Sequence, residues 1–202
     1  MSDVVLGPGD LAGTGVYAAR DFEAGEVVVP YRLTPLDEAA YLALPPGEDL
    51  FVHSYGGRRY LYPAPARFVN HSGDPSCHQD FDRGCDVALR PIARGEAITI
   101  DAGLETAREL STFLDAYRER RDLAGLVDAD AVLWVSGRVS RGRDAVTATL
   151  LDAATGPLTG VEWLVGTGRW EALCSAEEAG RHVTMLLKVI RGNWQMVYQH
   201  RG

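Results

Sequence analysis

Residues 67–77 of this 202-residue chain read RFVNHSGDPSC, and two other segments stand out in the same half of the sequence. Residues 13–26 read GTGVYAARDFEAGE, in which Gly13 and Gly15 form a glycine pair. Residues 90–101 read RPIARGEAITID, a turn that feeds a strand ending in a carboxylate. Each segment alone has an ordinary explanation, because glycine turns and Asn-His turns are common. Their order and spacing together decide how the first half of the chain is interpreted.

The glycine segment by itself also matches G-x-G-x-x-A, a dinucleotide-binding fingerprint. That fingerprint requires a strand before the glycines and a helix after them. Here a turn at residues 23–25 and a β-rich run follow instead, so we reject the dinucleotide interpretation. Paired glycines still allow a backbone to approach a ligand closely.

Composition sets wider limits on the class of protein. Hydrophobic residues make up 46% and charged residues 24%, which fits one large or two small globular domains. No apolar run reaches the ~18 residues of a membrane span, and the N-terminus has no secretory pattern. Three cysteines make no disulfide framework, so we predict a cytoplasmic protein.

The net charge of −8 is unevenly distributed. Residues 1–105 hold 8 arginines against 16 acidic residues, whereas the remainder is balanced, with Lys188 as the only lysine. This argues against nucleic-acid binding and favours a cationic partner for the first half. An acidic surface that only maintains solubility is the alternative.

The two halves differ in proline content and in predicted secondary structure. Residues 1–103 hold nine of the ten prolines and predict short strands at 27–29, 86–89 and 97–100, with one helix at 36–44. From residue 105 the pattern changes to α+β, beginning with a capping box at 106–109. The predicted elements are a helix to Tyr117, a strand at 131–135, a helix at 144–153, strands at 161–174 and 181–190, a turn at 191–193 and a strand at 194–200.

Together the three segments resemble the SET domain of lysine methyltransferases, over residues 4–103. The family's segments are G-x-G-v-f/y-A followed by r-d-i-x-x-G-e, then R-F-x-N-H-S-x-x-P-N-C, then G-E-E-l-t-x-D-Y. The resemblance implies a mainly β SET fold of small sheets with a pseudoknot. It also implies S-adenosylmethionine (SAM) as cofactor and a lysine that enters through a narrow channel. By resemblance the cofactor-binding residues are Gly13, Gly15, Val16, Tyr17, Arg67, Asn70 and His71. Ser72, Glu96 and Asp101 are then mainly structural.

This sequence departs from the family pattern at its catalytic tyrosine. The family places that tyrosine directly after the aspartate of the third segment, where this chain has Ala102. Three tyrosines before the Asn-His pair are candidate substitutes, namely Tyr55, Tyr60 and Tyr62. The second segment has Gly73 and Ser76 at family cysteine and asparagine positions, and the C-x-C-x-x-x-x-C zinc tail is missing. A zinc site made of His71, Cys77, His78 and Cys85 matches no standard spacing, so we predict no metal.

Residues 106–202 resemble the NTF2-like (SnoaL-like) family, an α+β cone that commonly dimerises through its sheet. The segments that carry this resemblance are FLDAY at 113–117, RDLAGLV at 121–127, DAVLWV at 130–135, RGRDAV at 141–146 and GNWQMVYQH at 192–200. Residues that would line its pocket are Tyr117, Trp134, Trp163, His182, Tyr198 and His200. Acid–base catalysis by His182 or His200 is an alternative to a place in the core.

The sequence therefore predicts a SET domain at residues 1–104 and an NTF2-like domain at 105–202. The predicted function is SAM-dependent N-methylation of a protein lysine or small amine by a homodimer formed through the NTF2-like domain. Two alternatives stay open. One is a catalytically altered SET scaffold whose chemistry or ligand binding lies in the NTF2-like pocket. The other is a non-enzymatic dimeric adaptor for a basic partner.

Overall fold

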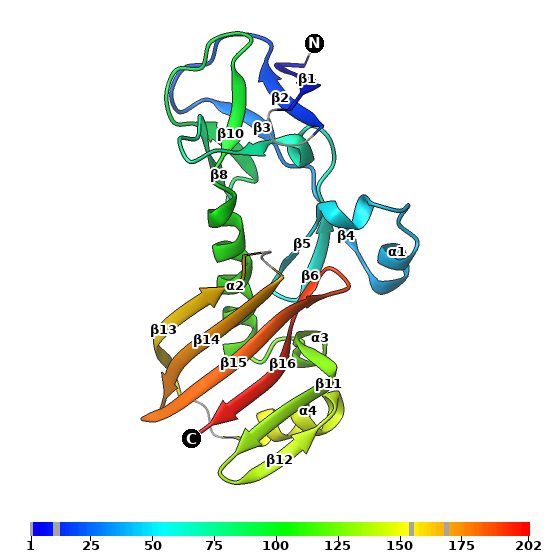
Figure 1. Ribbon diagram of the computed structural model, residues 1–202, viewed down its shortest axis with the longest axis vertical. Coiled ribbons are helices and arrows are strands. Elements are labelled where there is room, and N and C mark those ends of the chain that lie inside the picture. The colour runs from blue at the N-terminus through cyan, green and yellow to red at the C-terminus, as the bar shows by residue number, and fades with distance from the viewer. Residues whose placement is uncertain (1, 10–12, 154–155, 168–169) are drawn as a thin grey trace. The chain divides into compact units, whose positions relative to one another are not determined.

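The computed structural model describes residues 2–9, 13–153, 156–167 and 170–202, and these are mainly β with small sheets (Figure 1). The chain divides into two compact units. The first comprises residues 1–36, 44–52 and 60–108, and the second comprises residues 37–43, 53–59 and 109–202. Two short segments of the first half therefore cluster with the second unit.

Two small sheets build the first unit. One has the order β1-β2-β10-β7, in which β10 pairs in parallel with β7 and the other neighbours are antiparallel. The other is the antiparallel sheet β3-β9-β8. The bounds are β1 Val4–Pro8, β2 Thr14–Ala18, β3 Val27–Pro30, β7 Asn70–His71, β8 Cys77–Asp80, β9 Cys85–Ala88 and β10 Ala97–Ile100. The strands expected at 27–29, 86–89 and 97–100 are confirmed to within one residue.

A third sheet and short helical turns lie between these strands in the sequence. Its order is β4-β6-β5, with bounds β4 Thr34–Leu36, β5 Val52–Tyr55 and β6 Arg58–Leu61. Helix α1 (Glu38–Leu42) confirms the helix expected at 36–44, in shorter form. The Asp37 side chain accepts the Ala40 N–H at 2.7 Å as its N-cap, and Pro45 follows its end. Two 3₁₀ turns are η1 (Glu48–Phe51) and η2 (Ala66–Phe68).

The second unit contains a six-stranded sheet of order β12-β11-β16-β15-β14-β13, in which only β11 and β16 are parallel neighbours. The strand bounds are β11 Val127–Val135, β12 Arg138–Arg141, β13 Leu158–Val165, β14 Glu171–Glu178, β15 Arg181–Ile190 and β16 Asn193–Arg201. The helix bounds are α2 Ala102–Arg118, α3 Leu123–Leu126 and α4 Arg143–Asp152. The first residues of α2 belong to the first unit.

Two expectations for this half need correction. The single strand expected at 161–174 is wrong, because β13 and β14 form a hairpin in which the Gly166 N–H donates to the Glu171 carbonyl at 2.9 Å. Helix α2 begins at Ala102 rather than in the capping box at 106–109. The Asp101 carboxylate accepts the Gly103 N–H at 2.9 Å, which satisfies one of the first free amides of this helix.

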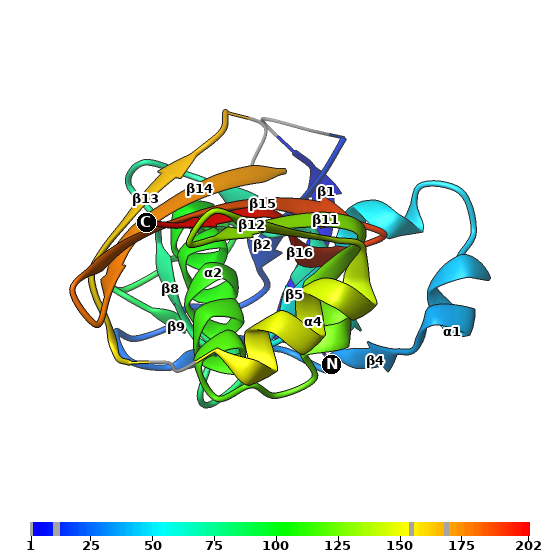
Figure 2. The ribbon, with the colours of Figure 1, turned by 90° about the horizontal axis from the view of Figure 1, so that it is seen from below.

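The core of the second unit lies between the sheet and its helices. Figure 2 shows α2 and α4 on one side of the six-stranded sheet. Alternate residues of β14 and β15 are buried in this core, as in Val183, Met185 and Leu187 of β15, which are at most 1% exposed. From α2, Leu110, Phe113, Leu114 and Tyr117 project into the same core at helical spacing. Among the helices that the structure describes, none is long and apolar enough to cross a bilayer.

Candidate functional site

The glycine segment and the Asn-His pair meet within the first unit. Strand β10 lies between β2 and β7, and Asn70 pairs with Thr99 of β10. The Asn70 Nδ2 donates to the Thr14 carbonyl at 3.5 Å. A Cβ at Gly15 would lie 3.2 Å from the Gly9 Cα and 3.4 Å from the Asn70 Nδ2. The close approach of these segments therefore favours glycine at position 15.

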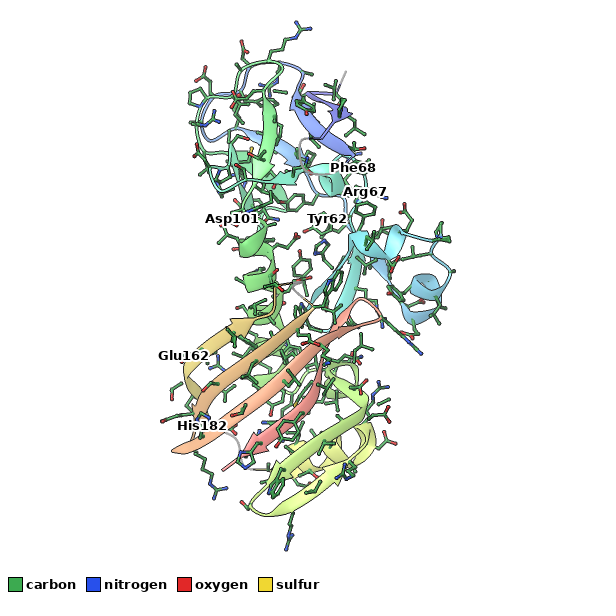
Figure 3. All side chains as sticks on the ribbon, viewed as in Figure 1. Tyr62, Arg67, Phe68, Asp101, Glu162 and His182 are labelled. Carbon is green, nitrogen blue, oxygen red and sulfur yellow. The ribbon has the colours of Figure 1, made fainter. Side chains whose placement is uncertain are left out.

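His71 contacts the start of α2. Its Nδ1 accepts the Ala102 N–H at 3.2 Å, so a neutral ring carries its proton on Nε2. The Asp101 Oδ1 lies 3.6 Å from the same Nδ1, and both side chains are a little under half exposed. An imidazole and a carboxylate therefore lie next to each other beside position 102, at the start of α2, where Figure 3 labels Asp101.

A buried acid lies in β9. Asp86 is 1% exposed, and the Tyr31 hydroxyl donates a hydrogen bond to its Oδ1. Burial raises the pKa of Asp86 to about 7; the hydrogen bond from Tyr31 opposes this rise and the Glu105 charge adds to it. Burial also raises the pKa of Tyr31, and the neighbouring Asp86 charge adds to that shift. Both groups therefore stay protonated to a higher pH than the same groups do when exposed.

These segments also match a known family. The family model described as the SET domain covers residues 13–103 of this chain. Residues 13–103 match the SET domain. A curated relative, the histone-lysine N-methyltransferase trithorax of Drosophila virilis, is 29% identical over 111 residues. That alignment covers 44% of this chain and 3% of the relative, so the chain spans a small part of its length.

A solved structure is similar as well. It is a Plasmodium falciparum protein described provisionally as a histone methyltransferase, with a TM-score of 0.40 and 15% identity. The superposition covers 50% of this chain and 93% of that chain. At this identity and TM-score it adds nothing about chemistry.

Three other expected cofactor residues of the SET domain are occupied by protein contacts. Arg67 pairs with Glu48 at 2.8 Å, and its guanidinium lies 4.7 Å from the Phe51 ring centroid and 5.8 Å from the ring centroid of Phe68, which Figure 3 labels beside it. Its buried Nε has no partner among the described residues. The Val16 side chain belongs to the core, and the Tyr17 hydroxyl donates to the Pro8 carbonyl.

The SET domain segments are held together by short polar contacts. Ser76 N–H donates to Thr99 Oγ1 at 3.0 Å, and Thr99 N–H donates to Ser76 Oγ at 2.9 Å. Glu96 accepts the Ala93 N–H at 3.0 Å and pairs with Arg90 at 2.6 Å. The first of these contacts lowers the pKa of Glu96 the most, so the carboxylate stays charged and closes the turn before β10.

The three candidate tyrosines are divided between the two units. Tyr62 is 5% exposed, and its ring centroid lies 5.3 Å from that of Tyr31. Tyr60 lies in the first unit and Tyr55 in the second. The ring of Tyr62 thus packs against Tyr31, the partner of Asp86.

The first unit also has a hollow of about 550 Å³. None of the expected cofactor residues lines it. Its lining residues are Ser2, Asp3, Val4, Val27, Val28, Pro30, Arg32, Pro63, Ala64 and Pro65.

The cysteines of the SET domain are buried free thiols. Burial, with a smaller contribution from the Asp86 charge, raises the pKa of Cys77 to about 12. The thiol that would have to become a metal-binding thiolate is thus held protonated. Within the described ranges, no group of three His, Cys, Asp or Glu side chains is arranged to hold a metal ion.

The expected pocket residues of the second half are divided between two faces of the six-stranded sheet. Tyr117 and Trp163 face the core. Trp134 and Tyr198 are 45% and 36% exposed on the opposite face, so the expectation of one shared pocket is wrong. His200 lies on that outer face against Trp134, with ring centroids 6.1 Å apart. His182, labelled in Figure 3, is exposed, and its Nε2 lies 3.1 Å from the Thr184 Oγ1.

A buried polar network lies where Tyr117 faces β16. The Tyr117 hydroxyl donates to Gln199 Oε1 at 2.9 Å and accepts from Arg201 at 2.7 Å. Arg201 and Glu178 form an ion pair of 2.9 Å, and each side chain is 6% exposed. The adjoining cavity holds about 10 Å³, close to the space of a single water molecule. The network therefore fills this part of the interior rather than lining a ligand pocket.

Sequence reasoning did not identify Tyr31, Asp86, Gln199 and Arg201. Asp86 had a detectable signal, because it is the one acidic residue in a β9 strand whose residues are all buried. A carboxylate in such a strand is costly unless it is paired or protonated. Tyr31 had no such signal, since its partner lies 55 residues away in the sequence.

Proposed function

We propose that this chain is a SET-family methyltransferase that transfers a methyl group from SAM to a protein lysine or a similar amine. The observation that carries the proposal is the contact between Asn70 and Thr14, which joins the glycine segment to the Asn-His pair inside the matched region. The parallel pairing of β7 with β10 supports the pseudoknot that the family implies. The relative from Drosophila virilis supports lysine as the acceptor.

The residues present fit an adenosyl cofactor. Gly13 is exposed, has a φ of 21°, and no atom lies within 4 Å of where its Cβ would stand, so a ligand can reach the backbone there. The Asn70 amide can donate and accept hydrogen bonds, and the exposed Nε2 of a neutral His71 ring can donate one. The unpaired buried Nε of Arg67 is a further donor. We assign the cofactor contacts to Gly13, Gly15, Val16, Tyr17, Arg67, Asn70 and His71.

Bound SAM supplies a methyl group on a positively charged sulfonium. The chain must present a neutral amine in line with that methyl and exclude water from the path. A tyrosine hydroxyl orients the amine, and Tyr62 is the best placed of Tyr55, Tyr60 and Tyr62 because it is buried beside Tyr31. Acidic residues of the first half favour approach of a cationic side chain.

The cofactor assignment is tested by calorimetric titration of SAM into the wild type and into Asn70→Ala. Loss of one hydrogen-bonding amide is expected to weaken binding roughly tenfold or more. Asp82→Ala is the control, because Asp82 is 89% exposed and should leave binding unchanged. A wild type that gives no heat with SAM would refute the cofactor assignment.

Ala102 favours a second candidate function, a SET scaffold whose catalysis is altered or absent. Transfer of a radiolabelled methyl group to protein in a cell lysate separates the two, with wild type compared with Ala102→Tyr. Label transfer by the wild type supports the methyltransferase. Activity in Ala102→Tyr alone supports the altered scaffold. Binding of a basic partner that weakens with salt, without label transfer in either, supports an adaptor.

For the second half we propose an NTF2-like domain that forms a homodimer. The order of the six-stranded sheet and the helices α2 and α4 on one side support the cone. On the other face an apolar row crosses five strands, formed by residues paired in register: Leu164, Leu173, Leu186, Tyr198 and Val132. The exposed fraction of Leu164 reaches 71%. Three buried free thiols support a reducing cytoplasm.

A further inference from the structure

The Tyr31–Asp86 pair joins a buried carboxyl to a partly buried hydroxyl. Asp86 is sealed from solvent at 1% exposure, whereas Tyr31 is only partly buried. The Tyr31 hydroxyl donates to Oδ1 of Asp86. Tyr31 therefore stands between the carboxyl and the solvent, with its ring packed on Tyr62.

The first turn of α2 contributes to the electrostatic environment of the pair. Glu105 acts on both Tyr31 and Asp86 electrostatically, and in α2 it is three residues beyond Ala102, on the same side of the helix. Ala102 in turn donates its N–H to His71 of the Asn-His pair. The proposed cofactor residue His71 thus contacts the start of the helix whose Glu105 charge acts on the buried carboxyl.

The titratable groups that interact electrostatically with Asp86 are all acids. They are Tyr31 after β3, Glu105 of α2, Cys77 of β8 and Cys85 of its own strand, with Tyr62 behind Tyr31. Among the described groups that act on the pKa of Asp86, none is a cation. The ionised carboxyl therefore lacks a countercharge, and a proton is the simplest way for it to become stable.

We propose that Asp86, acting through the Tyr31 hydroxyl, accepts the proton that the substrate ammonium must lose before methyl transfer. This inference rests on the proposed function. Tyr31 is the catalytic residue that touches the amine, and Asp86 is the residue that holds and positions its proton. The structure thereby assigns a proton acceptor to a chain that has alanine at position 102.

Two proton transfers precede the transfer of the methyl group. The ammonium gives one proton to the Tyr31 hydroxyl as that hydroxyl gives its own to the Asp86 carboxylate, which leaves a neutral amine and a neutral carboxyl. The amine lone pair then forms the new N–C bond while the S–C bond breaks, and the sulfonium becomes a neutral thioether. The methylated product carries the positive charge, and Asp86 later returns its proton to solvent through Tyr31.

The test is the pH dependence of label transfer to a fixed batch of cell-lysate protein, from pH 5.5 to 9, with wild type, Asp86→Asn and Tyr31→Phe. Burial raises the pKa of Asp86 to about 7, so the wild-type kcat should rise up to that pH and then level. Both variants should lose this inflection and at least tenfold in kcat near pH 7.5, with the KM for SAM unchanged. Asp82→Asn, an exposed change of the same kind, should keep the wild-type profile.

Thermal unfolding of each variant checks that it is folded, and calorimetry checks that it binds SAM. If label transfer occurs and Asp86→Asn keeps the wild-type inflection and kcat, the role of Asp86 is overturned while the proposed function stands. If the wild type neither binds SAM nor transfers label, the proposed function fails, and the proton-accepting role fails with it. A variant that loses only its affinity for SAM would also overturn the inference.

Discussion

At the scale of single residues, the buried Asp86 is the least ordinary feature of the first unit. It is 1% exposed and bonded to the Tyr31 hydroxyl, and burial raises the pKa of its carboxyl from 3.8 to about 7. The folded state therefore holds this proton over a pH range in which the unfolded chain releases it. Protein stability must then fall as the pH rises from about 4 to about 7.

Asp86→Asn should remove this pH dependence. Between pH 5 and pH 8 the wild type should lose roughly 3 kcal/mol of unfolding free energy relative to the variant, at ~1.4 kcal/mol per pKa unit. Urea unfolding at several pH values measures the difference. Asp82→Asn serves as the matched control, because the Asp82 side chain is 89% exposed. Parallel curves for wild type and Asp86→Asn would contradict the assignment of a raised pKa.

At the scale of elements, the turn between β5 and β6 depends on glycine for two reasons. Gly57 has a φ of 80°, which favours glycine, and a Cβ there would stand 2.9 Å from the Leu126 Cδ2. Leu126 belongs to α3 and is fully buried in the core of the second unit. The turn is therefore shaped by the packing of the second unit as well as by its own backbone.

Gly57→Ala should destabilise the protein by roughly 2–3 kcal/mol, of which about 1 kcal/mol is backbone strain and the rest is overpacking against Leu126. Gly25→Ala separates the two causes, because Gly25 has a φ of 86° with no atom within 4 Å of its Cβ position. That variant should lose only about 1 kcal/mol. If chemical denaturation gives the same loss of unfolding free energy for Gly57→Ala and Gly25→Ala, the contact with Leu126 contributes nothing.

At the scale of the whole molecule, the outer face of the six-stranded sheet is unusually apolar. The row from Leu164 to Val132 joins exposed or half-buried side chains of five neighbouring strands. Side chains opposite one another in a sheet act as a unit, so this row forms a continuous strip. Such strips on soluble proteins commonly mark contact surfaces.

Leu173→Glu combined with Leu186→Glu should convert the proposed homodimer to a monomer. The two positions are directly paired in the sheet, so the added charges repel one another and would face an apolar partner surface. Light scattering after gel filtration measures the mass. Ala107→Glu adds one charge at an exposed helical position and should leave the mass unchanged. A wild type that is monomeric at all concentrations would exclude the homodimer.

Much of the fold followed from local patterns. The strands at 27–29 and 97–100, helix α1 and the final hairpin were readable because each has turn residues at its ends. The strand expected at 161–174 failed because apolar residues lie on both sides of Gly166, and a hairpin of two strands with apolar residues gives the same pattern of letters as one long strand. The expected start of α2 failed because Asp101, rather than the capping box, holds the first turn.

The sequence by itself determined which part of the chain matches the SET domain, since the motifs at 13–103 are visible in their order and spacing without coordinates. Only the tertiary structure decided which side chains meet. Tyr31 reaches Asp86 across 55 residues, and Trp134 and Trp163 fall on opposite faces of one sheet. The physical reason is that motifs are local in the chain, whereas burial, and with it the pKa of a carboxyl, depends on neighbours that are brought together only when the sheets pack.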